Sequence, residues 1–78
     1  MIEKGMFFRN NASAELSYSV KGKNYYIESF DKRGEEFLFR VDVGDEITLH
    51  KSGGDVVKMV VVDCEDVPPI QCLARQLP

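Results

Sequence analysis

Apolar and polar residues alternate along most of this chain, a pattern typical of half-buried β-strands. The clearest stretch spans residues 14–20, where Leu16, Tyr18 and Val20 fall on one face. Further strands are predicted, with turn signals between them, at residues 24–30, 36–43, 46–50, 56–64 and 70–76. The segment at 56–64 is almost continuously apolar, which predicts burial on both of its faces.

Turn-forming residues separate these segments. Lys21-Gly22-Lys23 predicts a tight hairpin, residues 31–34 a four-residue turn ending in glycine, and residues 51–55 a loop. No long window places apolar residues at i, i+3, i+4 and i+7, so no helix longer than about two turns is expected. The sequence therefore predicts an all-β protein: a small SH3-like barrel or a compact antiparallel meander of five to six strands. Residues 6–8 would supply an additional edge strand or a plug.

The length of 78 residues predicts one domain spanning residues 1–78. No apolar run is long enough to cross a membrane, and no apolar stretch follows the first charged residues as in a secretory signal. We therefore expect a cytoplasmic protein without membrane contact.

The two cysteines, Cys64 and Cys72, flank a Pro-Pro turn. If that hairpin is symmetric about Val67, the cysteines are diagonal neighbours about 7–8 Å apart, which is beyond disulfide geometry. Both thiols are therefore expected to be free. Two cysteines and a single histidine also make a poor zinc site, so no metal or cofactor is expected.

The sequence offers few residues that could carry out catalysis. The only histidine, His50, lies beside Lys51, and no serine or cysteine is placed to use it as a base. Ser52-Gly53-Gly54 lacks the spacing of a phosphate-binding loop. We therefore expect a protein that is not an enzyme.

A charged end is predicted from topology. In an up-and-down meander successive turns alternate between the two ends of the sheet, so the turn at 31–34 and the loop after residue 50 would share one end. That end would gather a possible anion or nucleic-acid site made of Lys32, Arg33, His50 and Lys51. The opposite end would be acidic, with Asp45, Glu46, Glu65 and Asp66, tempered by Lys21 and Lys23. The net charge of −3 argues against a general nucleic-acid binder.

Two aromatic pairs, Phe7-Phe8 and Tyr25-Tyr26, offer contact residues. Neighbouring residues on a strand point to opposite faces, so each pair would give one ring to the core and one to the surface. Exposed rings could stack on nucleic-acid bases or cover a protein, and the acidic chain favours a protein. The leading hypothesis is a binding or assembly module acting through protein–protein contact, self-association included. The alternative is a nucleic-acid-binding barrel that uses its basic end.

The C-terminal part of the chain also resembles a known family. The matching features are a glycine–aspartate pair, alternating apolar residues, a Lys-Ser-Gly-Gly loop, a methionine-led strand and a later cysteine. Here they are Gly44-Asp45, Ile47, Leu49, Lys51-Ser52-Gly53-Gly54, Met59-Val60-Val61 and Cys72. Over the last 35 or so residues the sequence is similar to the YodC-like family of small bacterial proteins. The resemblance implies an SH3-like barrel and leaves the biochemical role open.

Overall fold

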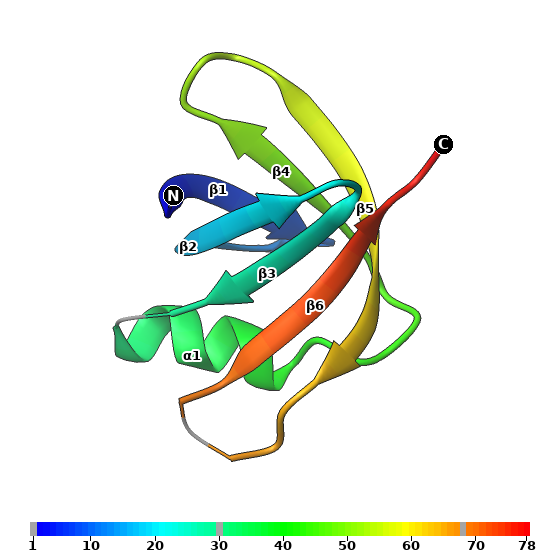
Figure 1. Cartoon of the computed structure of the whole chain (residues 1–78). Helices are drawn as coiled ribbons and strands as arrows, with labels where there is room; N and C mark the ends of the chain where they lie inside the picture. The colour runs from blue at the N-terminus through cyan, green and yellow to red at the C-terminus, as the bar shows by residue number, and fades with distance from the viewer. Residues whose placement is uncertain (1, 30, 68) are drawn as a thin grey trace.

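The computed structural model describes residues 2–29, 31–67 and 69–78 and shows six strands and one helix. Figure 1 shows the strands closed into a barrel, with the helix across one mouth. The elements are β1 (Glu3–Arg9), β2 (Ala12–Lys21), β3 (Asn24–Glu28), α1 (Lys32–Phe39), β4 (Glu46–Lys51), β5 (Val56–Cys64) and β6 (Gln71–Gln76). The predicted class, a small all-β barrel, is confirmed. The end predicted for the second strand, Phe30, lies outside the described residues.

The barrel consists of two three-strand meanders joined by α1. Its strand order is β1-β2-β3-β6-β5-β4, and every neighbouring pair is antiparallel. The pairs β1–β4 and β3–β6 close the ring, so the described strands leave no free sheet edge, which would otherwise template aggregation. Residues 6–8 belong to β1, which pairs on both sides and is a full barrel strand, not an edge or a plug.

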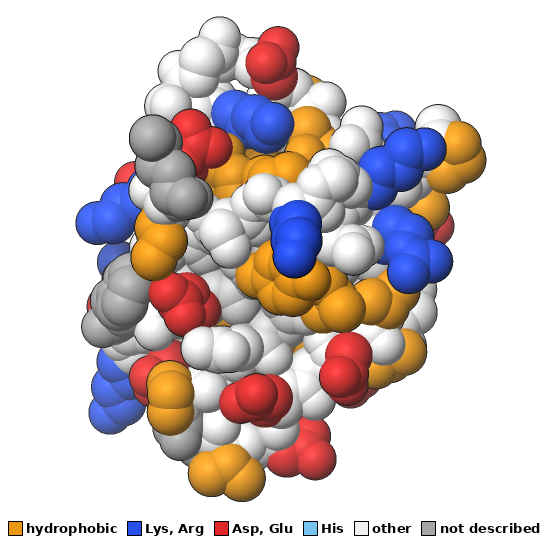
Figure 2. Space-filling view, viewed as in Figure 1, with side chains coloured by type: hydrophobic (Ala, Val, Ile, Leu, Met, Phe, Trp, Pro, Cys, Tyr) orange, Lys and Arg blue, Asp and Glu red, His pale blue; other side chains and the backbone are white. Residues whose placement is uncertain are grey.

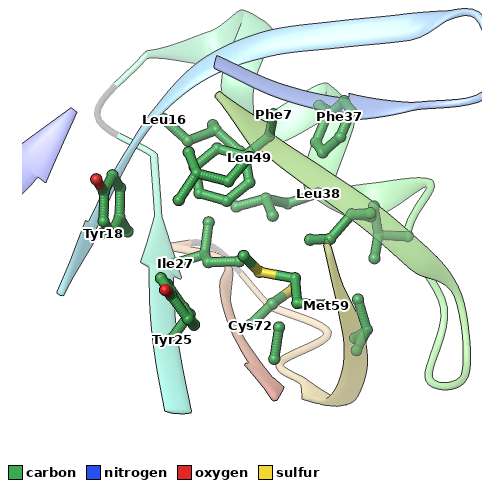
Figure 3. Close-up of a cluster of buried hydrophobic side chains, with 14 of the residues drawn as sticks. Phe7, Leu16, Tyr18, Tyr25, Ile27, Phe37, Leu38, Leu49, Met59 and Cys72 are labelled. Atoms are coloured by element: carbon green, nitrogen blue, oxygen red, sulfur yellow. The ribbon is translucent and has the colours of Figure 1, made fainter. Parts of the chain in front are cut away.

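Side chains that alternate inward along the strands fill the barrel, as Figure 3 shows. Phe7, Tyr18 and Tyr25 stand in a row of aromatic contacts, with ring centroids 5.8 Å apart for Phe7–Tyr18 and 6.0 Å for Tyr18–Tyr25. In β5 only Met59 and Val61 are buried. The prediction that this strand is buried on both faces is wrong, because a strand in a single closed barrel has one inner and one outer face.

The strand predicted at residues 36–43 is wrong, because residues 36–39 belong to α1 and residues 40–43 form the connection to β4. The Asp31 carboxylate accepts a hydrogen bond from the Gly34 backbone N–H at 2.7 Å and caps the helix. The predicted turn at 31–34 is thus the start of the helix. Gly34, Phe37 and Leu38 are buried at helical spacing, and Val41 continues the same face.

The prediction of two free thiols is also wrong. Cys64 and Cys72 lie directly opposite each other in β5 and β6, with their Cα atoms 4.2 Å apart, and form a disulfide. The hairpin is centred one residue later than predicted, because β6 pairs only from Gln71 and Ile70 is buried in the core. Pro69 has no backbone N–H to extend the ladder.

Candidate functional site

The two aromatic pairs divide between core and surface as predicted. Phe7 is 0% exposed and Tyr25 is 3% exposed, whereas Phe8 and Tyr26 are 36% and 44% exposed. Strand alternation alone explains this division. Phe8 and Tyr26 are therefore the members available for contact.

Phe8 and Tyr26 do not share a surface. Phe8 pairs with Ser13 on β2, and Tyr26 pairs with Ser19 on the same strand. Six residues of extended chain separate these partners by roughly 20 Å. The Phe8 ring packs against His50, with centroids 4.6 Å apart, so part of its surface is already covered.

The four predicted anion-site residues also separate. Lys32 and Arg33 begin α1, whereas His50 and Lys51 end β4 at the other mouth of the barrel. They do not meet because α1 replaces a strand: a helix that crosses one mouth returns the chain to the same end, so the alternation of turns breaks. The Lys51 ammonium instead lies 5.7 Å from the centre of the Tyr25 ring.

Tyr26 lies in a surface groove that sequence reasoning did not find. The groove, here called the β3–β6 groove, has a volume of about 270 Å³ and crosses the outer face of neighbouring strands. Tyr26 and Leu73 face each other in the register of β3 and β6, and Ile2 extends the apolar surface. Around these apolar side chains lie Glu28, Asp63, Glu65 and Gln71.

The charge lining the β3–β6 groove is of one sign. Three carboxylates line it, and the described lining residues include no Lys or Arg. Gln71 Nε2 donates to Glu28 Oε2 at 3.0 Å, which fixes one carboxylate at the groove wall. Tyr18 also borders the groove, and burial together with the nearby Glu3 carboxylate raises the pKa of its phenol. The groove therefore favours a cationic ligand with an apolar part.

One signal in the sequence pointed toward this groove. Gln71, Leu73 and Arg75 alternate with the inward-facing Cys72 and Ala74, so period two predicts their outward face. The contact of Leu73 with Tyr26 needed the β3–β6 register, which joins segments far apart in the sequence.

Comparison of the chain with protein-family models, with curated proteins and with solved structures finds no match. Among the described residues, no helix is both long and apolar enough to cross a membrane. The same part of the chain contains no group of three or more His, Cys, Asp or Glu side chains arranged to hold a metal ion.

Proposed function

We propose that this protein is a non-enzymatic binding module that holds a segment of another protein in the β3–β6 groove. The exposed Tyr26 ring beside the half-buried Leu73, in an acidic depression, carries this proposal. Tyrosine is enriched among residues that dominate binding energy, because it buries a large rigid surface and keeps a polar tip. A volume of 270 Å³ is small beside the roughly 300–1,000 Å³ of sites for drug-sized ligands. It suits a few side chains better than an organic cofactor.

The residues that line the groove indicate which side chains a bound segment would carry. An apolar side chain would pack between Tyr26 and Leu73, and Lys or Arg side chains beside it would meet Glu28, Asp63 and Glu65. Arginine and carboxylate form strong paired hydrogen bonds when partly shielded from water. A strand-addition mode is disfavoured, because the closed ring offers no free edge among the described strands.

A peptide selection tests this proposal. A random peptide library would be selected on the wild type, and the enriched peptides measured by fluorescence polarisation. We expect peptides with Lys or Arg near an apolar residue, whose affinity falls at least tenfold in Tyr26→Ser and in Leu73→Ser. Phe8→Ser removes an aromatic of comparable exposure outside the groove and should leave affinity unchanged. Enriched peptides that bind all four proteins equally, or no enrichment at all, would refute the groove as the binding site.

Three further statements about this protein stay proposals. They are that the barrel is SH3-like, that the chain is related to the YodC-like family, and that the protein is cytoplasmic. The Cys64–Cys72 disulfide weighs against the cytoplasm, because disulfides are rare in cytosolic proteins. Nucleic-acid binding, the alternative function, can no longer rest on Lys32, Arg33, His50 and Lys51 as one cluster.

A further inference from the structure

Charge is strongly separated between the two ends of the barrel. The α1 end comprises α1, the turn at 10–11, the described part of the β5–β6 connection and the strand ends beside them. The turn end comprises the turn at 22–23, the loop at 52–55, and the described residues at the start of β1 and after β6. The turn end holds six Lys/Arg and two Asp/Glu, a formal charge of +4; they are Lys4, Lys21, Lys23, Lys51, Lys58 and Arg75, with Glu3 and Asp55. The α1 end holds the other four Lys/Arg and eleven Asp/Glu, a formal charge of −7.

Figure 2 shows this separation on one face of the molecule. Most of its acidic side chains lie over the lower half. Lys and Arg side chains lie at the top, centre and right, and others lie along the left edge. In the same view of Figure 1, α1 and the β5–β6 turn lie at the bottom, the β4–β5 loop at the top and the C-terminus at the right. The small net charge of −3 therefore conceals two oppositely charged ends.

Exposed apolar residues accompany the charges at each end. At the α1 end a depression of about 160 Å³ contains the exposed side chains of Phe39 and Val43. Asp42, Cys64, Glu65 and Asp66 also line it. At the turn end Val20 is exposed next to Lys21, and Val56 is exposed at the start of β5. Each end thus combines apolar contact area with charge of one sign.

We propose that copies of this chain associate head to tail, the turn end of one copy seating on the α1 end of the next. The occupant is a second copy because the chain itself carries both complementary surfaces, in charge and in apolar area. Electrostatic complementarity orients such an encounter and fixes its polarity, while the apolar residues supply contact area. A head-to-tail contact is heterologous, so it continues into a ring or a filament and does not stop at a dimer.

Two charge-reversal variants test the contact. Lys21→Glu/Lys23→Glu makes the turn end less basic, and Asp42→Lys/Asp66→Lys makes the α1 end less acidic. These four residues are exposed and lie outside the lining of the β3–β6 groove, so peptide binding there should survive. By sedimentation at low salt, the wild type should show mass that rises with concentration and falls with added salt. Each variant alone should associate at least tenfold more weakly.

Mixing the two variants gives the sharper measurement. In an equal mixture the unchanged turn end of the Asp42→Lys/Asp66→Lys variant can seat on the unchanged α1 end of the Lys21→Glu/Lys23→Glu variant. That contact has the wild-type charges, so the mass should rise above that of either variant alone. Lys32→Glu/Arg33→Glu is the matched control: it changes net charge by as much as the turn-end variant, but at the α1 end. It should associate at least as well as the wild type, which excludes general repulsion as the cause.

Several results would overturn the proposal. A wild type that stays monomeric at about millimolar concentration and low salt would do so, as would a mixture no heavier than its separate components. An equal loss in Lys32→Glu/Arg33→Glu would also contradict it, because that result means simple repulsion. If the wild type is monomeric and a labelled single-stranded RNA or DNA binds with loss in Lys21→Glu/Lys23→Glu, the turn end is a nucleic-acid site instead. Circular dichroism melts would establish that each variant is folded.

Discussion

Breaking the Cys64–Cys72 disulfide should lower the stability of the barrel substantially, since the bond closes the β5–β6 hairpin. The two cysteines are 8 residues apart in the sequence. For a loop of about nine residues, the chain-entropy relation gives roughly 2.6 kcal/mol at 25 °C. For a domain of this size each kcal/mol shifts the melting temperature by about 4–8 °C, so reduction should lower it by roughly 10–20 °C.

Thermal unfolding by circular dichroism, with and without a phosphine reductant, measures this shift. The variant Cys64→Ala/Cys72→Ala is the control: it should melt near the reduced wild type and should not respond to the reductant. Alkylation of the unreduced wild type followed by mass spectrometry should find no free thiol. Two alkylated thiols in the native protein would refute the disulfide itself. A reduced melting temperature within about 3 °C of the oxidised one would refute the estimate of its contribution.

Two further predictions concern the core. Gly34→Ala should lower the free energy of unfolding in urea by about 1–3 kcal/mol, although alanine usually favours a helix, because the added Cβ would collide with Leu16 and Ser29. The control Arg33→Ala, on the exposed side of α1, should change this free energy by no more than about 0.5 kcal/mol. A Gly34→Ala variant more stable than the wild type would contradict this packing. The pKa of Tyr18 is raised above 10.0, so its contribution to stability is complete below pH 10 and is lost as pH rises through the raised value. The alkaline loss should be smaller in Tyr18→Phe, and an unchanged profile would exclude Tyr18 as its source.

The local pattern of apolar and polar residues was sufficient to predict most strands, but it did not predict α1. Alternation located β2, β4 and β5, because a barrel strand has one buried and one exposed face. Residues 36–43 were predicted as a strand because Phe37, Phe39, Val41 and Val43 also alternate with period two. The helical face includes Gly34, whose lack of a side chain allows α1 to lie against Leu16 and Ser29. A glycine used for close packing looks like a turn signal in the sequence.

The candidate site depended on pairings that no local pattern contains. The exposure of Phe8 and Tyr26 and the burial of Phe7 and Tyr25 were predictable, because they follow from the alternation of side chains along a strand. The partner of Tyr26 was not, because Leu73 is placed by the register between β3 and β6. The position of Lys51 relative to Lys32 likewise depended on whether the intervening segment was a strand or a helix. One wrong element therefore placed Lys32 and Arg33 at the end opposite to His50 and Lys51.

The β5–β6 hairpin links the two proposed surfaces, which gives reduction a consequence beyond stability. Cys72 lines the β3–β6 groove and Cys64 lines the depression at the α1 end, while Glu65 lines both. Loosening this hairpin would disturb the acidic wall of both sites together. The charge reversals at Lys21 and Lys23, in contrast, touch neither wall and should affect only association. A reductant that weakened peptide binding and self-association in parallel, well below the melting temperature, would therefore identify the hairpin as their common support.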